Sequence, residues 1–391
     1  MGPRNIRALD GIRGIAIILV MLHHFVVVLP PQNGVLRFIK TLFEYGWSGV
    51  DLFFVLSGFL ITGILIDTRT ATNYFRAFYV RRVLRIFPLY YAVLIAVFAV
   101  ATFRVPRPWL APVAGDGKLY FLYLTNWLAL WKGPWGPNLL GHFWSLAVEE
   151  QFYLIWAVCA WLLIPSRLAK FAIGGSVIAL ICRLVWVAHT GPSQAVVMAT
   201  VTRMDSLFCG ALAAIVFRDR AKLEAIRGKL PYIAMVAVFT FAAGVIVAAR
   251  FSNWERAIFV ETYGLTLLAA GFAAFVLHAA VTDDTGTLLQ SILGKRTLTR
   301  FGKYSYGIYV FHVPILMLCG VLIYRYGGVP IFEKLWVSIL YFVFLFGASF
   351  YTAKFSYEYF ERHFLNLKRF FEPDMSKANG RGQIAEVVQS R

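Results

Sequence analysis

The stretch RALDGIRGIAIILVMLHHFVVVLP, residues 7–30, decides the fold class of this 391-residue chain. It is apolar and long enough to cross a bilayer as one helix, yet it contains the ionisable side chains of Asp10, Arg13, His23 and His24. A charge at membrane depth is costly unless it faces a protein interior or a water-filled cavity. The stretch therefore predicts a transmembrane helix that forms one wall of a polar site.

Helical geometry selects two of these residues. Arg13 and His24 are eleven positions apart, which at about 100° per residue returns to within roughly 20° of the same direction, about 16 Å further along the axis. This spacing predicts that both side chains point into one cavity. His23 lies roughly 80° off that line, so we expect His24 to carry the chemistry and His23 to have a packing or orienting role.

The composition is that of a polytopic membrane protein. The chain is 59% hydrophobic and 15% charged, with a mean hydropathy of +0.67, so it has more apolar surface than a soluble fold of this size can bury. Its net charge of +18 comes from short basic clusters between apolar stretches, which indicates membrane topology and not nucleic-acid binding. The four cysteines lie in apolar runs without metal-ligand spacing, so we expect neither a disulfide nor a metal site.

A sliding apolar window predicts an all-α bundle of about ten spanning helices that encloses a polar cavity. The predicted spans are residues 8–30, 47–67, 86–103, 143–164, 170–189, 200–217, 231–250, 257–280, 302–325 and 335–360. We expect one transmembrane domain over residues 1–372 and a disordered cytoplasmic tail over residues 373–391. The first span is longer than the apolar core of a signal peptide, and we expect it to be retained.

Basic residues predict the orientation. Ten crossings place both termini on one side, where the loops hold more than twice as many lysines and arginines as the opposite loops. The positive-inside rule therefore predicts cytoplasmic termini in an inner (plasma) membrane. On the other side, residues 118–131 are apolar but too short to span, and Trp127, Trp131 and Trp135 lie in or near this segment. It forms either a lid over an outward-facing site or part of an interfacial aromatic belt.

Polar side chains recur inside or at the ends of the other spans. Ser145 and Glu149 share a helix face at i,i+4, and Arg183 lies in the fifth span. A structural ion pair or a hydrogen-bonded packing histidine would explain any one such residue, but together they predict a polar chamber inside the bundle. We expect this chamber to bind substrate through Asp51, Ser145, Glu150, Arg203, Asp205 and His312.

A basic cluster precedes the third span, in the sequence YVRRVLRIFPLYY. Arg81 and Arg85 are four positions apart and Arg82 and Arg85 are three, so all three can share one helix face. Guanidinium groups concentrated in this way bind phosphate groups. From spacing alone, however, an ordinary positive-inside cluster in contact with anionic lipid is the favoured interpretation.

Seven stretches in this chain resemble the acyltransferase 3 family of integral membrane acyltransferases, in family order from residue 8 to about residue 365. They are LDGIRGIAIILVMLHHF, GVDLFFVLSGFLIT, RRVLRIFPLYY, FWSLAVEEQFYLIW, TRMDSLFCGALAA, GKYSYGIYVFHVPI and YFERHF. In residues 361–364 the sequence ERHF replaces the proline-containing pattern common in the family. This departure concerns only the local end of the helix.

The resemblance implies an enzyme that moves an acyl group, most often acetyl, from acyl-CoA to a hydroxyl of a sugar, a glycan or another small acceptor, without a metal. The family's functional positions fall on Arg13 and His24, on Arg81, Arg82 and Arg85, and on Ser145 and Glu149. The three clustered arginines would then hold the phosphate groups of coenzyme A. His24 would act as a general base or as an acyl carrier, and Glu149 would pair with an intramembrane arginine or shape the acceptor pocket.

Two other functions share some of these features. A proton-coupled transporter also places ionisable residues inside a helical bundle, but it needs no coenzyme A. A membrane glycosyltransferase with a lipid-linked donor would have no use for the three clustered arginines. The sequence contains no P-loop, GxSxG or HExxH motif. It leaves the acceptor, the acyl chain length and the oligomeric state open.

Overall fold

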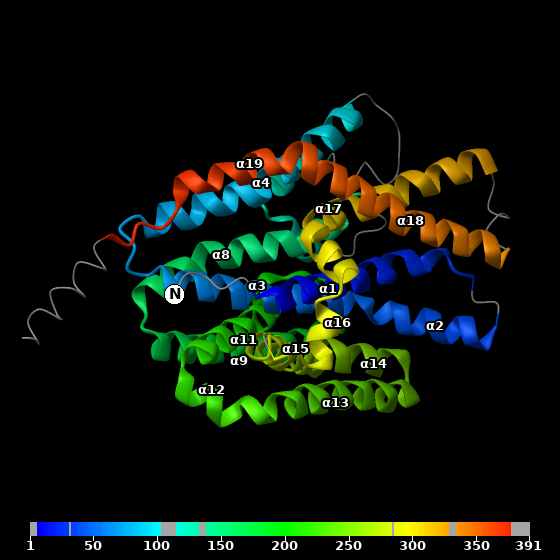
Figure 1. The fold of residues 1–391 in the computed structure, drawn as a ribbon. Coiled ribbons are helices and arrows are strands. Elements are labelled where there is room, and N and C mark those ends of the chain that lie inside the picture. The colour runs from blue at the N-terminus through cyan, green and yellow to red at the C-terminus, as the bar shows by residue number, and fades with distance from the viewer. Residues whose placement is uncertain are drawn as a thin grey trace, which may run out of the picture.

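The computed structural model describes residues 6–30, 33–102, 115–132, 138–283, 285–327 and 334–376. Every regular element in these ranges is helical, which confirms the predicted all-α bundle. Most of the long helices lie roughly along one common direction (Figure 1). Trp135 and nearly all of the predicted tail lie outside the described residues.

The long helices correspond in position to the predicted spans. The helices are α1 (Arg7–Phe25), α2 (Gly34–Glu44), α3 (Ser48–Asp67), α4 (Tyr74–Thr102), α6 (Gly117–Phe121), α7 (Leu128–Lys132), α8 (Trp144–Leu162), α9 (Pro165–Thr190), α10 (Gln194–Met198), α11 (Thr200–Arg218), α12 (Arg220–Ile226), α13 (Leu230–Phe251), α14 (Asn253–Phe259), α15 (Leu265–Val281), α16 (Leu288–Leu293), α17 (Arg296–Gly327), α18 (Leu335–Ser356) and α19 (Arg362–Asn366). π-Helical turns, Val260–Gly264 and Tyr357–Glu361, precede α15 and follow α18.

Eight stretches of the described chain are long and apolar enough to cross a bilayer, against about ten predicted. The helices α8 and α17 coincide with the other two predicted spans but are not among the eight. In α8 the run Glu149, Glu150 and Gln151 lowers the hydropathy of a helix that is otherwise apolar. Two of these residues, Glu149 and Glu150, are ones that the sequence assigns to a site.

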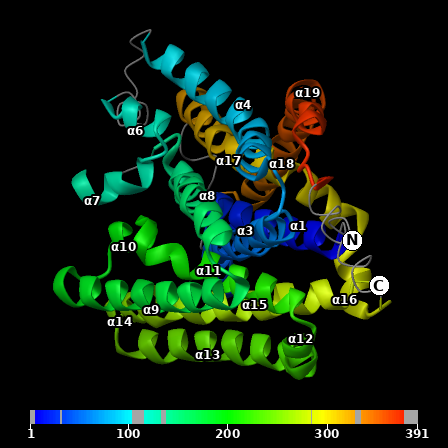
Figure 2. The ribbon, with the colours of Figure 1, turned by 90° about the vertical axis from the view of Figure 1, so that its left-hand side faces the viewer.

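Helix α1 lies near the centre of the bundle and packs closely against α17 (Figures 1 and 2). A Cβ atom added at Gly14 would lie 2.1 Å from the carbonyl oxygen of Leu298, and one added at Gly302 would lie 1.9 Å from that of Asp10. The two backbones are therefore in direct contact, which only glycine permits. This contact holds the first turns of α1 against the start of α17.

Helices α3 and α11 make a similar contact. A Cβ atom at Gly58 or at Gly210 would lie 2.0 Å from a backbone carbonyl oxygen of the other helix, so both glycines are required for this close packing. The crossing brings Asp51 of α3 to Arg203 of α11, with 2.9 Å between Oδ1 and Nη2. The Asp51 carboxylate is thus paired with an arginine 152 residues later in the chain.

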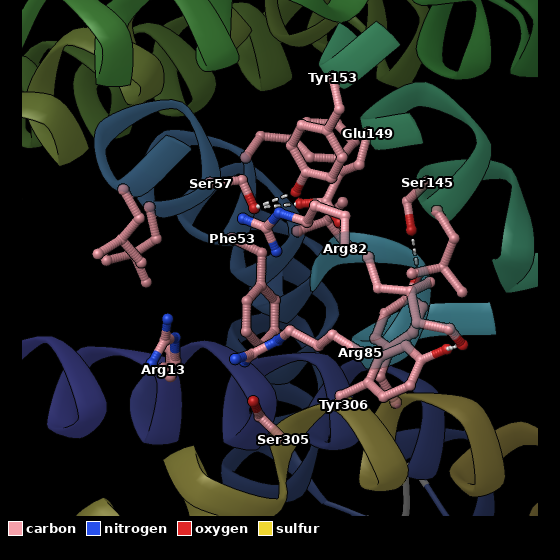
Figure 3. A pocket seen from close by; sticks show the side chains of 17 residues that line it. Arg13, Phe53, Ser57, Arg82, Arg85, Ser145, Glu149, Tyr153, Ser305 and Tyr306 are labelled. Atoms are coloured by element: carbon pink, nitrogen blue, oxygen red, sulfur yellow. Dashed lines mark hydrogen bonds between the residues drawn. The ribbon is translucent and has the colours of Figure 1, made fainter. Parts of the chain in front are cut away.

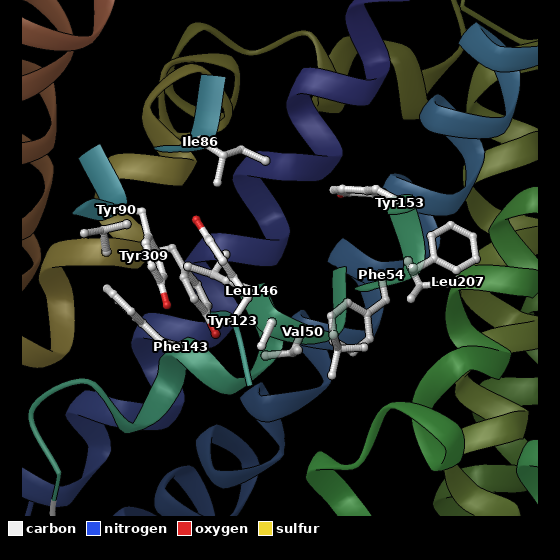
Figure 4. Packing of buried hydrophobic residues seen from close by; sticks show 14 of the residues in the cluster. Val50, Phe54, Ile86, Tyr90, Tyr123, Phe143, Leu146, Tyr153, Leu207 and Tyr309 are labelled. Carbon is white, nitrogen blue, oxygen red and sulfur yellow. The ribbon is translucent and has the colours of Figure 1, made fainter. Parts of the chain in front are cut away.

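A buried aromatic cluster fixes the connection between α4 and α8 (Figure 4). The ring of Tyr90 stacks on Tyr123 at 4.1 Å and on Phe143 at 5.0 Å between centroids. Its hydroxyl donates a hydrogen bond to the carbonyl oxygen of Tyr120 (2.8 Å). The predicted apolar segment in this connection is divided into the short helices α6 and α7 and a 3-10 turn, Thr125–Trp127, so it does not span.

Helices α9, α13, α14 and α15 form a layer along one side of the bundle (Figure 2). Arg183 of α9 is fully buried there and forms an ion pair with Asp205 of α11 at 2.6 Å. It also donates hydrogen bonds to backbone carbonyl oxygens of Thr262 and Thr202 and to the hydroxyl of Thr266. The intramembrane arginine of the fifth span is therefore satisfied inside the protein.

Candidate active site

Three pockets follow one another along α1. We call them the basic pocket, which includes Arg7, Arg13 and Lys303; the middle pocket, which includes Arg13 and Glu149; and the histidine pocket, which includes His24. Their cavity volumes are about 420, 100 and 330 Å³ respectively. The middle pocket is therefore a constriction between two wider ones.

The basic pocket lies at the start of α1 and α17. Among the residues that the structure describes, five cationic side chains line it, Arg7, Arg13, Arg85, Arg300 and Lys303, together with two acidic ones. Of these acids, Asp10 accepts from Arg13 at 2.6 Å, whereas Glu361 accepts a hydrogen bond from the Ser356 hydroxyl. The pocket therefore carries an excess of positive charge, which suits an anionic ligand.

The middle pocket joins α1, α3, α4, α8 and α17 (Figure 3). Arg13 and Arg85 line both this pocket and the basic pocket, so the two are adjacent. The Arg82 guanidinium lies over the ring of Tyr153 at 4.8 Å. The Ser57 hydroxyl donates a 2.5 Å hydrogen bond to Glu149 and accepts one from the Tyr153 hydroxyl at 3.0 Å. Residues from three helices are thus locked around a narrow polar passage.

Val50 and Tyr309 line both the middle pocket and the histidine pocket. The Tyr309 hydroxyl donates to the backbone carbonyl oxygen of His142 (2.8 Å) and lies 2.5 Å from the hydroxyl of Ser145. The hydrogen-bonded side chains of Tyr309 and Ser145 join α17 to α8 between the pockets. A group that passes from one pocket to the other must pass this wall.

In the histidine pocket, hydrogen bonds define the proton positions on His24. Its Nδ1 lies 2.9 Å from the carbonyl oxygen of Val20, and because a carbonyl can only accept, this nitrogen carries a proton. In the neutral ring the lone pair is then on Nε2, which is the atom that a base or nucleophile needs. The Nδ1 of His312 contacts the carbonyl oxygens of Ile308 and Tyr309, and its Nε2 lies 3.3 Å from Nδ1 of His24. His312 therefore lies behind His24 as an acceptor.

Arg203 lines the histidine pocket and is almost completely buried. Nη2 binds Asp51, while Nε and Nη1 have no hydrogen-bond partner among the described residues. The guanidinium lies against the rings of Phe54 and Trp144, at 5.7 and 5.8 Å from their centroids. The carboxylate of Asp51 balances its charge, so this pocket has unsatisfied donors without an excess of charge.

The prediction that Arg13 and His24 share one cavity is wrong, because the two side chains line different pockets. Arg13 lines the basic and middle pockets and His24 lines the histidine pocket. Both do point toward the interior, as their similar helical angle requires. The separation of about 16 Å along α1 is long enough for Val50 and Tyr309 to lie between them.

Several residues predicted to bind substrate do not line any of the three pockets. Glu150 is one of them. Of the arginine cluster, Arg82 and Arg85 line a pocket and Arg81 does not. Asp205 and His312 instead contact other side chains, Arg183 and His24. The residues placed outside these pockets are Arg81, Asp51, Glu150, Asp205 and His312.

The pockets also contain residues that sequence reasoning did not assign to a site. Arg300 and Lys303 belong to the basic residues that were used only to predict the membrane orientation. Their i,i+3 spacing could have indicated that they share one face of the helix. Tyr309 lies one turn before His312, within a motif of the resemblance. Within the described residues, no three His, Cys, Asp or Glu side chains are arranged to hold a metal ion.

Comparison with known protein families assigns the chain to a family. An acyltransferase domain matches residues 6–354, nearly the whole helical bundle. The chain belongs to this acyltransferase family. The match confirms the predicted family, and it does not support the proton-coupled transporter. No solved structure matches the chain.

The chain is similar to several curated O-acetyltransferases. Peptidoglycan O-acetyltransferase OatA of Listeria monocytogenes is 30% identical over 336 residues, which are 81% of this chain and 50% of that protein. Putative peptidoglycan O-acetyltransferase YrhL of Bacillus subtilis is 31% identical over 333 residues, 81% and 49% of the two chains. O-acetyltransferase OatA of Staphylococcus aureus is 28% identical over 344 residues, 84% and 53%. The chain thus spans about half the length of these relatives.

Proposed function

We propose that this chain is a membrane O-acetyltransferase that moves an acetyl group from acyl-CoA to a hydroxyl of a glycan. The family supports acyl transfer, and the names of the relatives, which specify O-acetylation of peptidoglycan, suggest that glycan as the acceptor. We further propose that the chain lies in the plasma membrane with the start of α1 at the cytoplasmic face, where acyl-CoA is available.

One observation carries the assignment of the two substrates: the pockets at the two ends of the path differ in charge. In the described part of the chain, the basic pocket has five cations against two acids, whereas Arg203 of the histidine pocket is paired with Asp51. A phosphate-bearing donor gains from the first environment. An uncharged sugar suits the second, where Trp47 and Trp144 offer apolar faces and Arg203 offers free N–H donors.

Between the ends, the narrow middle pocket would hold the slender pantetheine arm of the donor. Arg82 and Arg85 would contact its polar groups, and Arg13 would hold donor oxygens where the basic and middle pockets meet. Glu149, which is fixed by Ser57, would keep this arginine-lined passage from carrying too much positive charge. Each of these roles depends on a side chain that lines the pocket.

His24 is the proposed catalytic residue. Its Nε2 lone pair would either remove the proton from the acceptor hydroxyl as that oxygen attacks the thioester carbon, or attack the thioester itself and then pass the acetyl group to the acceptor. In the first route the proton taken up by His24 passes to the departing sulfur, so coenzyme A leaves as the thiol. In the second route coenzyme A leaves as the thiolate, and it is protonated by the proton that the acceptor hydroxyl gives up when it takes the acetyl group from His24. His312 would hold His24 in the required tautomer, since its Nε2 accepts from Nδ1 of His24.

The test is the pair His24→Ala and His189→Ala. His189 makes the same local contact as His24, from Nδ1 to the carbonyl oxygen four residues earlier (2.8 Å), but it is exposed on α9. Membranes that contain each variant are supplied with labelled acetyl-CoA, and surface glycan is analysed by mass spectrometry for the addition of one acetyl group. We expect His24→Ala to abolish the addition and His189→Ala to leave it intact. Normal transfer by His24→Ala would refute the assignment.

A further inference from the structure

The basic pocket contains cations that the proposed mechanism does not use. Arg300 and Lys303 are on one face of α17, close to Arg7 of α1, and they line only the basic pocket. Neither has a carboxylate within ion-pair distance among the described residues. Lys303 instead lies over the rings of Tyr304 and Tyr357, at 5.2 and 4.9 Å. Two cations thus line the pocket without an ion-pair partner among the described residues, and one of them, Lys303, packs against two aromatic rings.

The order of the cations along the path matches the order of groups in coenzyme A. Arg13 and Arg85 line both the basic and the middle pocket, so they lie where the pantetheine arm would enter the constriction. The pyrophosphate follows the pantetheine directly in coenzyme A, and the 3′-phosphate is on the ribose at the far end of the molecule. Arg300 and Lys303 lie on the side of the basic pocket away from the middle pocket, since they do not line the latter.

We propose that Arg300 and Lys303 bind the 3′-phosphate of coenzyme A, while Arg13 and Arg85 bind its pyrophosphate. This proposal rests on the proposed function, because it takes acyl-CoA as the donor. It relocates the main phosphate site from the cluster at Arg81 to the contact between α1 and α17. A guanidinium and an ammonium group together supply the charge-assisted hydrogen bonds that a dianionic phosphate accepts.

The Gly302 contact explains why these cations are fixed relative to α1. Gly302 lies between Arg300 and Lys303 in the sequence, and its Cα is held against the backbone of Asp10. Arg13 is three residues further along α1 and is oriented by Asp10. The cations of the two helices therefore form one preorganised group, so binding of the phosphates needs little rearrangement of the backbone.

The same chemistry could hold the phosphate of an anionic lipid, so the experiment separates the two sources. Purified protein in uncharged detergent is titrated calorimetrically with coenzyme A and with dephospho-coenzyme A, which lacks only the 3′-phosphate. The double variant Arg300→Gln/Lys303→Gln is compared with Lys295→Gln/Arg296→Gln. The control removes the same charge from exposed residues at the same end of α17 that do not line the pocket.

We expect the wild type and the control to bind coenzyme A at least about tenfold more tightly than dephospho-coenzyme A. A difference of this size is expected because dephospho-coenzyme A lacks one charge-assisted contact. The Arg300→Gln/Lys303→Gln variant should bind both ligands with the affinity that the wild type has for dephospho-coenzyme A. If this variant keeps the full preference for coenzyme A, the proposal is wrong while the proposed function stands.

A second arm adds phosphatidylglycerol to the micelles and records the thermal melting temperature. If phosphatidylglycerol stabilises the wild type but not the Arg300→Gln/Lys303→Gln variant, and coenzyme A binds both equally, the pocket holds lipid headgroups and the proposal is overturned. If the wild type binds no coenzyme A in the detergent with or without phosphatidylglycerol, acyl-CoA is not the donor and the proposed function fails. The two failures therefore give different results.

Discussion

The contact between α1 and α17 predicts that Gly302→Ala damages both stability and activity. A Cβ atom at residue 302 would lie 1.9 Å from the carbonyl oxygen of Asp10, although such contacts essentially never fall below 3.0 Å. The neighbour is backbone and cannot rotate away, so the two helices must separate by about 1 Å or more. Overpacking of this kind costs about 1–3 kcal/mol, which outweighs the gain of up to about 1 kcal/mol in helix propensity.

The same separation moves Arg13 away from the cations of α17. A displacement of about 1 Å in a group that positions substrate can reduce a rate roughly 100-fold. We therefore expect Gly302→Ala to lower acetyl transfer by one to two orders of magnitude in membranes that hold the same amount of protein. Its melting temperature in detergent should also fall. The melting temperature is measured by size-exclusion chromatography of samples heated to increasing temperatures.

Gly320→Ala is the matched control. It makes the same substitution in the same helix, at a position where a Cβ atom would have no neighbour within 4 Å. This variant should keep full activity and melt at the same temperature as the wild type or slightly higher. The reasoning is refuted if Gly302→Ala and Gly320→Ala give equal melting temperatures and equal transfer rates, because the close helix contact would then have no consequence.

Three further predictions concern stability, each measured by chemical or thermal unfolding in detergent. Arg183→Leu should cost about 3–5 kcal/mol because it leaves the buried carboxylate of Asp205 unpaired, and the double variant with Asp205→Leu should recover part of that loss; a double variant no better than the single one would contradict this. Arg218→Gln, which breaks the partly exposed pair with Asp67, should cost less than about 1 kcal/mol. Trp156→Phe should cost about 1 kcal/mol, since its indole N–H donates at 2.7 Å to a buried threonine hydroxyl of α3; no measurable loss would show that this bond adds nothing net.

The corrections to the sequence predictions have a common cause. Helical periodicity gives the direction of a side chain around its own axis, so it correctly turned Arg13 and His24 toward the interior. It does not say what lies between two residues on the same face. Tyr309, from a helix that begins almost 300 residues later, lies at that place and divides the expected cavity into two pockets.

The sequence by itself determined the helical spans, the family and the presence of buried polar groups. These are properties of single segments, because a bilayer requires each spanning segment to be apolar, long enough and internally hydrogen-bonded. Only the tertiary structure decided which charges meet: Asp51 with Arg203, and Arg13 with the cations of α17. These ion pairs and clusters depend on which helices cross. The crossings are set by contacts between helices, such as that of Gly302 with the backbone of α1, and a sequence pattern within one segment does not predict them.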